Sequence, residues 1–403
     1  MNICKHFGVC GGCQFLDIPY AQQLEQKQKD LQGLLKKFWA GPVPITPAPQ
    51  TEFYRNKIEL CFCRQPVWKE PFNKKFRRDP NEPLEFETAL GFKLKGRWDR
   101  GFNLQECIIF EPYLPRLLEA VRVWATQNNI EYYDQRNHSG VLRGIMLRHC
   151  KNTGEVMLVL YAAAESFDKK SFVSAVEDVL PQADILLAVN ASVADAMLIE
   201  KPEVLKGRSA VCETIKTDGG QREIKFTLSA QSFFQTNTFA AQNMYQRVRD
   251  AVKKLSPHTV YDLYGGAGSF SLVCADAAQK FFCVESAPQA VADGRANAEL
   301  NGVRNVNFVC AKTEDFLKTQ KISAHNSLII LDPPRGGLHI DAEAAVAKSG
   351  VKNIIYISCN PLTLARDLEE LTKNYAVKNC AAFDFFPHTK HVETMVELEL
   401  KAG

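Results

Sequence analysis

The sequence contains no uninterrupted apolar run long enough to cross a bilayer and no N-terminal segment of the signal-peptide type. It also has no internal repeat and no low-complexity tract. The 403 residues are 46% hydrophobic and 24% charged, which is ordinary for a globular protein and enough for two or three domains. We therefore predict a soluble, cytoplasmic protein.

A disulfide framework is missing as well. Thirteen cysteines are an odd number, and most of them are scattered through apolar segments. In a reducing cytosol, clustered cysteines indicate metal binding or catalysis instead. Cys4, Cys10 and Cys13 have the spacing C-x5-C-x2-C, and Cys107 is the best candidate for a fourth ligand. Four thiolates fit either an iron–sulfur cluster or a zinc site, for which His6 is a further candidate ligand.

A large net charge is also absent, because the whole chain carries only +3. Residues 53–102, however, hold twelve Lys/Arg and seven Asp/Glu, so they carry +5 and the rest of the chain −2. Ten aromatic residues are interleaved with these charges. A basic, aromatic-rich stretch suits backbone phosphates and unstacked bases of RNA, and a solvated charged surface is the alternative.

Periodicity and turn residues predict alternating helices and strands in the second half of the chain. Asn237 is a candidate N-cap for a helix that extends to about Leu255. Strands follow near 259–264, 280–284, 306–310, 327–331 and 353–357, and an antiparallel pair near 380–386 and 394–400. This pattern predicts a mostly parallel α/β sheet that is covered on both faces.

The first half is predicted to be a looser mixture of elements. We expect helices over 20–39, 112–128 and 167–180, a strand over 53–64, short strands near 86–94, a hairpin over 142–150 and 155–162, and a strand over 185–190.

A glycine-rich turn, Gly265 to Gly268, follows the first strand of the predicted sheet. It is not a full dinucleotide fingerprint, so a dehydrogenase fits poorly. Glu285 ends the next strand, about 20 residues on, where an acid can bind ribose hydroxyls. A nucleoside ligand without pyrophosphate suits S-adenosylmethionine.

Cys359 follows the apolar strand 354–357 and precedes Asn360-Pro361, which must turn the chain. It therefore lies at the carboxyl end of a strand, where open α/β sheets bind ligands. A small core residue is the structural alternative. Asp332-Pro333-Pro334 follows a neighbouring strand, and Arg335 comes next, where methyltransferases of exocyclic amines have an aromatic residue.

A cysteine and a carboxylate such as Glu393 together suit methylation of a pyrimidine carbon. Carbon 5 of uracil is a poor nucleophile until a thiolate adds to carbon 6, and a base must then remove the proton from carbon 5. Amine methylation needs no cysteine. We keep two other hypotheses: an amine methyltransferase in which Cys359 and Glu393 are structural, and a non-catalytic RNA-binding protein.

In these residues the chain resembles the RNA uracil carbon-5 methyltransferases, many of which carry an iron–sulfur cluster. The resemblance covers nearly the whole chain, and Ser-Cys-Asn-Pro followed by Leu364-Ala365-Arg366-Asp367-Leu368 is especially specific. It is densest in 4–13, 231–237, 262–268, 332–336, 358–368 and 386–393.

The resemblance implies a class I (Rossmann-like) methyltransferase fold and a role for each matching residue. Cys359 would be the nucleophile and Glu393 the base. Contacts with S-adenosylmethionine would come from Gln235, Tyr264, Glu285, Asp332 and Ser269, the last standing where many relatives have asparagine. Cys4, Cys10, Cys13 and Cys107 would hold a [4Fe-4S] cluster. Gly265 stands where many relatives have cysteine.

We expect three domains, in line with this resemblance. Residues 1–110 would form an iron–sulfur-binding and basic RNA-contacting region, 111–230 a central α/β RNA-recognition domain, and 231–403 the methyltransferase domain. Because the sequence begins at the cysteine motif, we expect no TRAM domain of the kind that some relatives carry. This favours 23S ribosomal RNA as the substrate, with a uridine-54-type transfer RNA activity as the alternative, and implies no obligate protein partner.

Overall fold

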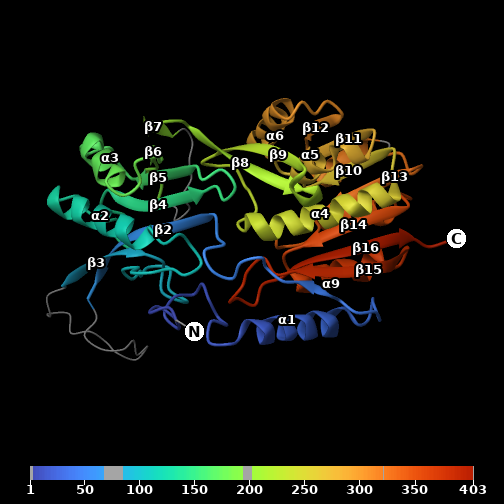
Figure 1. The fold of residues 1–403 in the computed structure, drawn as a ribbon, viewed down its shortest axis with the longest axis horizontal. Helices are drawn as coiled ribbons and strands as arrows, with labels where there is room; N and C mark the ends of the chain where they lie inside the picture. The colour runs from blue at the N-terminus through green and yellow to red at the C-terminus, as the bar shows by residue number, and fades with distance from the viewer. Residues whose placement is uncertain (1–2, 68–84, 194–201, 321, 403) are drawn as a thin grey trace. The chain divides into compact units, whose positions relative to one another are not determined.

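Two large sheets carry the fold, and each belongs to a separate unit of the chain (Figure 1). The computed structural model describes residues 3–67, 85–193, 202–320 and 322–402. Unit 1 comprises residues 1–14, 55–149 and 154–211. Unit 2 comprises residues 15–54, 150–153 and 212–403.

The sheet of unit 1 has the strand order β3-β2-β4-β5-β6-β7, and only the pair β5–β6 is parallel. Alternation along β2 sends Ile58, Leu60 and Phe62 into a core shared with helices α2 and α3. The elements are β2 (Lys57–Pro66), β3 (Phe86–Gly91), α2 (Leu114–Gln127), β4 (Leu142–His149), β5 (Val156–Ala162), α3 (Lys169–Glu177), β6 (Asp184–Val189) and β7 (Glu203–Lys206).

The sheet of unit 2 has the order β1-β15-β16-β14-β13-β10-β11-β12. Strands β10 to β14 are parallel to one another, and β16 runs antiparallel between β14 and β15. The strands are β1 (Ile45–Thr46), β10 (Thr259–Leu263), β11 (Lys280–Glu285), β12 (Val306–Cys310), β13 (Ser327–Leu331), β14 (Asn353–Ser358), β15 (Tyr375–Phe383) and β16 (Glu393–Leu400).

Helices cover both faces of this sheet. Leu31, Phe316, Val346 and Leu364 place α1, α7, α8 and α9 on one core with the sheet. Helices α4 and α5 pack together, and α5 covers the other face, where Ser271 donates to Asp262. The helices are α1 (Tyr20–Leu35), α4 (Thr238–Leu255), α5 (Ser269–Val273), α6 (Pro288–Leu300), α7 (Thr313–Thr319), α8 (Ile340–Ala347) and α9 (Pro361–Leu371).

The predicted mostly parallel sheet with an antiparallel terminal pair is confirmed, and so is the N-cap, since Asn237 Oδ1 accepts from Ala240 N (3.1 Å). The domain boundaries differ from the prediction. Residues 15–54 and 212–230, which we assigned to the first two domains, belong to unit 2. The reason is long-range pairing: β1 extends the large sheet beside β15, and α1 packs on α9.

A hairpin of β8 (Ala210–Thr217) and β9 (Arg222–Ser229), which the sequence analysis missed, precedes α4. Within the described ranges, no helix is both long enough and apolar enough to cross a membrane. Of the basic stretch 53–102, residues 68–84 lie outside the described part of the chain.

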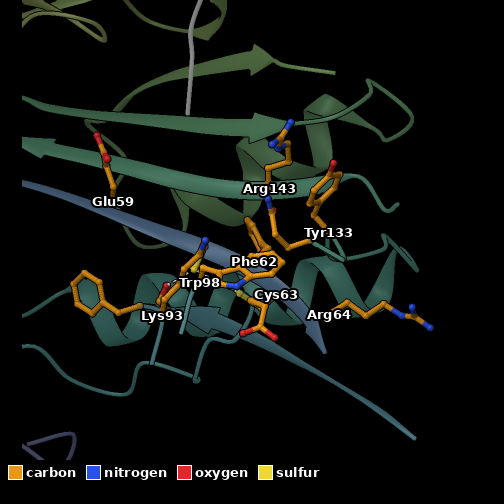
Figure 2. A pocket seen from close by; sticks show the side chains of 13 residues that line it. Glu59, Phe62, Cys63, Arg64, Lys93, Trp98, Tyr133 and Arg143 are labelled. Carbon is orange, nitrogen blue, oxygen red and sulfur yellow. Dashed lines mark hydrogen bonds between the residues drawn. The ribbon is translucent and has the colours of Figure 1, made fainter. Parts of the chain in front are cut away.

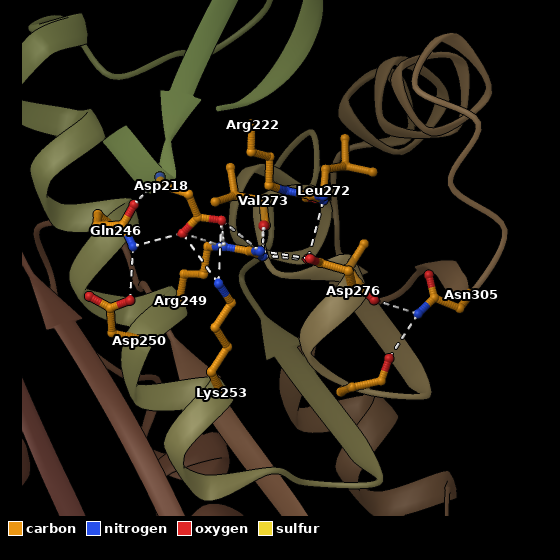
Figure 3. Close-up of polar contacts among 12 residues, drawn as sticks. Asp218, Arg222, Gln246, Arg249, Asp250, Lys253, Leu272, Val273, Asp276 and Asn305 are labelled. Atoms are coloured by element: carbon orange, nitrogen blue, oxygen red, sulfur yellow. Dashed lines mark hydrogen bonds and ion pairs between the residues drawn. The ribbon is translucent and has the colours of Figure 1, made fainter. Parts of the chain in front are cut away.

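A buried arginine on α4 ties this hairpin to the end of α5 and the segment that follows it (Figure 3). Arg249 on α4 is 2% exposed, and its Nη2 donates to Asp276 Oδ2 (2.6 Å) beyond α5. Its Nε donates to Asp218 Oδ2 (3.1 Å) at the hairpin turn, and its Nη1 to the carbonyl of Val273 (2.9 Å). One guanidinium thus holds three segments, because its five donors form a fixed fork.

Arg249→Leu should lower the free energy of unfolding by about 2 kcal/mol, measured by urea denaturation. The loss should be below the roughly 3–5 kcal/mol of a fully buried pair, because Asp276 can recover water. Arg247→Leu on the same helix is the control: its pair with Glu397 (3.1 Å) is half exposed and contributes at most about 1 kcal/mol. Equal losses in the two variants would contradict the assignment.

Candidate active site

The predicted site residues of unit 2 follow strands whose carboxyl ends share one edge of the sheet. Strands β10, β11, β13 and β14 are parallel, and they end before Tyr264, at Glu285, before Asp332 and before Cys359. Strand β10 lies between β11 and β13, where the strand order reverses. Open α/β sheets bind ligands at such a reversal.

The glycine-rich turn after β10 is built around positive φ angles. Gly266 has φ 56° and Gly268 φ 80°, which favour glycine. Glu285 Oε2 accepts from Gly266 N (3.1 Å), so the acid at the end of β11 contacts the turn. A Cβ atom at Gly265 would lie 2.4 Å from Cys283 Sγ, so a larger residue at this position would require a shift of the neighbouring strand.

The reversed strand β16 brings Glu393 beside Cys359. Ser358 on β14 is opposite Thr394 on β16, so one further step in this antiparallel register sets Cys359 against Glu393. Asn360 then turns the chain: its Oδ1 caps α9 at Leu362 N (3.2 Å), and its Nδ2 donates to the carbonyl of Arg335 (3.0 Å). The nucleophile and base predicted from sequence are therefore neighbours.

Burial and like charge shift the pKa of these groups upward. Glu393 is 3% exposed, and desolvation together with the charge of Asp332 raises its pKa to about 8. Desolvation and the charges of Glu393 and Asp332 raise the pKa of Cys359 to about 11. Asp332 itself has a pKa raised to about 7 by desolvation and by Asp262. Arg335 opposes the shifts of Cys359 and Glu393, and a further cation would favour the charged forms.

The loop that leads into Glu393 is held by polar residues that the sequence analysis missed. On α1, Lys27 Nζ donates to Asp384 Oδ1 (2.7 Å), and both side chains are buried. Gln23 Oε1 accepts from His388 N (2.9 Å). Gln23 and Lys27 stand four residues apart on the same stripe as Leu31 and Leu35, so polar residues on an apolar helix face were the available signal.

The motif before α4 contributes to the same loop. Asn237 Nδ2 donates to the carbonyl of Phe385 (3.0 Å) while Oδ1 caps the helix. Gln235, two residues earlier, is partly exposed. Ser269 begins α5 and forms a hydrogen bond with Tyr245, a buried residue of α4 that sequence reasoning also missed. Burial raises the pKa of Tyr245, and the charges of Asp332, Asp262 and Glu393 raise it further.

The four predicted cluster cysteines lie together in unit 1. The pKa of Cys13 is raised to about 12 by desolvation and then by Cys107, Cys10 and Cys4. Yet in the part of the chain that the structure describes, no three His, Cys, Asp or Glu side chains are arranged to hold a metal ion. The donor set thus fits a cluster in number and type, while its present geometry is not that of a ligand set. His6, the further candidate zinc ligand, accepts a hydrogen bond at Nε2 from Gln105 N (2.9 Å), so this nitrogen is already engaged by the backbone.

Comparison with known proteins gives an independent view of the whole chain. The sequence profile of the tRNA (uracil-5-)-methyltransferase family matches residues 196–401. An uncharacterized RNA methyltransferase of Bacteroides thetaiotaomicron is 32% identical, over 99% of this chain and 87% of its own. One of Clostridium tetani is 32% identical, over 99% and 84%.

The chain belongs to the tRNA (uracil-5-)-methyltransferase family. The predicted enzyme class, an RNA (uracil-C5-)-methyltransferase, is thereby confirmed. A solved relative supports the fold: the Pyrococcus abyssi tRNA (uracil-54, C5)-methyltransferase in complex with S-adenosyl-L-homocysteine is 26% identical. Its TM-score is 0.75, and the match covers 97% of this chain and 86% of that one.

Glu393→Gln should raise the melting temperature of the ligand-free enzyme, and the gain should grow as the pH rises from about 5 to about 8. In the unfolded chain Glu393 ionises near its ordinary pKa of 4.5, but in the fold only near 8. The wild type therefore loses stability across this window, whereas the amide does not ionise.

Differential scanning fluorimetry at several pH values measures this effect. Glu397→Gln is the control, because Glu397 lies on the same strand but is paired with Arg247. A gain for Glu393→Gln that stays constant with pH would contradict the buried protonated carboxyl.

Proposed function

We propose that this enzyme methylates carbon 5 of a uridine in RNA, with S-adenosylmethionine as the methyl donor and a covalent bond between Cys359 Sγ and carbon 6 of the uracil as intermediate. One observation carries the proposal: the register of β14 against β16 sets Cys359 beside the buried Glu393, at the edge that holds the glycine-rich turn. Neither an amine methyltransferase nor a passive RNA-binding protein needs this pair.

The chain's own residues would act in two stages. Cys359 first loses its thiol proton to solvent, and the thiolate adds to carbon 6. The electron pair of the C5–C6 double bond passes into an enolate, which makes carbon 5 nucleophilic. When bound, S-adenosylmethionine supplies an electrophilic methyl group for carbon 5. Glu393, as carboxylate, then takes the proton from carbon 5, so that elimination restores the uracil double bond and releases Cys359. The target base must leave its stack, because carbon 6 is not accessible to a thiol within it.

The same edge of the sheet supports a site for S-adenosylmethionine. The positive φ angles of Gly266 and Gly268 give a turn whose backbone a nucleoside can approach. Glu285 lies against that turn, where an acid can accept hydrogen bonds from ribose hydroxyls. Tyr264, Ser269, Asp332 and Gln235 complete the proposed set. A sulfonium cation would lower the raised pKa values of Asp332 and Glu393 and so favour the carboxylate that the base requires.

Cys359→Ala should bind S-adenosylmethionine normally and transfer no methyl group, because the uracil is never activated. Glu393→Gln should instead accumulate as a covalent adduct with methylated RNA, because the proton on carbon 5 stays. Gel electrophoresis under denaturing conditions, with label in the methyl group of the donor, separates the two outcomes.

Free methylated RNA from Cys359→Ala at the wild-type rate would contradict the covalent mechanism. An unlabelled adduct of Glu393→Gln would contradict the assignment of Glu393 to the step after methyl transfer. His388 and His391 lie in the loop before Glu393, and slow turnover of Glu393→Gln would identify one of them as a second base. Cys310→Ala, which removes an exposed cysteine of the same unit, is the control and should retain activity.

The RNA target has two candidates. A 23S ribosomal RNA uridine is the prediction from sequence, whereas the Pyrococcus abyssi relative acts on uracil 54 of transfer RNA. Mass mapping of both RNA classes from a deletion strain, before and after restoring the gene, distinguishes them. The cytoplasmic location stays a prediction.

The proposal extends to Cys4, Cys10, Cys13 and Cys107 as ligands of a four-iron cluster with a structural role, since methyl transfer moves no electrons. Burial raises the pKa of all four thiols, and other cysteines of the set raise those of Cys4, Cys13 and Cys107 further, so a cation would stabilise the set as thiolates. Binding would require their side chains to converge further than they do here.

Anaerobically purified protein should therefore be brown and contain about four irons per chain. Cys13→Ser should lose both the colour and the iron, and Cys310→Ser should keep them. Stoichiometric zinc without visible absorption would contradict the cluster.

A further inference from the structure

A cavity of about 320 Å³ opens in unit 1, beside the strands β2 and β4 (Figure 2). Its floor is the face of β2 that carries Glu59, Cys61 and Cys63. Phe62, between them in sequence, packs into the core and also borders the cavity. The sulfurs of Cys61 and Cys63 are 3.5 Å apart. No residue of the proposed catalytic or cofactor site belongs to this cavity.

The wall of the cavity is the loop after β3, residues 92–102, which is hydrogen-bonded to β2. Gly101 N donates to Gln65 Oε1 (2.8 Å), and Gln65 Nε2 donates back to the carbonyl of Gly101 (3.0 Å). Leu94 N donates to the carbonyl of Arg100 (2.9 Å). These hydrogen bonds anchor the loop, whose Lys93 and Trp98 line the cavity. Trp98 is 60% exposed.

Aromatic and cationic side chains line the remainder of the cavity. The guanidinium of Arg143 lies 4.5 Å from the ring centre of Tyr133, and Arg143 donates to the carbonyl of Asn190 (2.7 Å). Figure 2 shows Arg143 and Tyr133 on the β4 side of the lining, and Lys93 and Trp98 on the loop after β3.

The two acids of the lining are already paired with cations. Glu59 contacts Lys57 (2.7 Å), and Asp99 contacts Arg97 (2.8 Å) as well as Arg136. The lining holds three cations, Arg64, Lys93 and Arg143, against these two acids, which is an excess of one positive charge. Of the three, Arg64 also lies 3.6 Å from Asp134 outside the lining. This charge favours an anionic ligand.

We propose that this cavity binds the base of one unpaired nucleotide of the RNA substrate, a different nucleotide from the uridine that is methylated. Trp98 would stack on the base, and Lys93 would pair with an adjoining phosphate. The inference rests on the proposed function, because it takes RNA as the substrate. Unstacked bases bind on aromatic rings and arginine planes next to cations, which is what this lining offers.

Size and exposure favour a nucleotide of a longer chain over a free metabolite. The volume is at the lower end of the roughly 300–1,000 Å³ of small-molecule sites, and such sites bury about 70–90% of their ligand. A largely exposed tryptophan at the wall suits a base that remains attached to a strand outside the cavity.

Trp98→Ala in the full-length enzyme should weaken RNA binding about tenfold, within the range that stacking of one base contributes. KM for RNA should rise by a similar factor, while kcat at saturating RNA, binding of S-adenosylmethionine and the melting temperature stay unchanged. Trp98→Phe should restore most of the affinity. Unchanged RNA affinity in Trp98→Ala would overturn the proposal.

Lys93→Gln should make the salt dependence of RNA binding shallower by about one phosphate contact. Lys170→Gln is the matched control, because Lys170 is an exposed lysine of the same unit on α3. Equal salt slopes for the wild type and Lys93→Gln would show that Lys93 does not contact a phosphate of the RNA.

Photocrosslinking locates the base directly. RNA carrying a single 4-thiouridine, moved through the unpaired positions, should crosslink to the peptide of Trp98 from a position other than the methylated one. Uridine monophosphate binding as tightly as RNA would instead identify a metabolite site. If the wild type binds and crosslinks RNA here but methylates none, the proposed function fails while this binding site stands.

Discussion

The antiparallel register of β16 between β14 and β15 is the constraint on which the active site depends. Side chains alternate along a strand, so a slip of one residue would turn Glu393 to the opposite face of the sheet. The register is secured by two neighbours at once, because Glu393 is also opposite Phe383 of β15. In a sheet that was parallel throughout, the residue before Thr394 would lie at the far edge from Cys359.

Burial raises the pKa of both Cys359 and Glu393, and it also destabilises the ionised forms that the proposed reaction needs. A carboxyl at 3% exposure next to Asp332 holds its proton to about pH 8, and the neighbouring thiol is also kept neutral. In the ligand-free site Glu393 and Cys359 therefore keep their protons at neutral pH, and additional positive charge would favour their ionised forms. The network on the buried side of α1, where Lys27 meets Asp384, keeps the approaching loop in place without adding charge to the site itself.

Unit 1 shows how differently cysteine can be used within one domain. Cys13 and Cys107 belong to a set of thiols whose charges act on one another, whereas Cys61 and Cys63 form the floor of a cavity. Sequence spacing distinguishes these poorly, since C-x-C and C-x2-C differ by one residue. The strand decides: alternation sends both Cys61 and Cys63 to the same face of β2.

The sequence by itself determined the alternating elements, the glycine-rich turn, the cap at Asn237 and the candidate pair Cys359 and Glu393, because each depends on local periodicity or on chemistry carried by a short motif. It did not determine that residues 15–54 join the methyltransferase sheet, that Lys27 and Gln23 hold the loop before Glu393, or that Trp98 borders a cavity. Those features join residues far apart in the chain, and only the packing of the folded units brings such residues into contact.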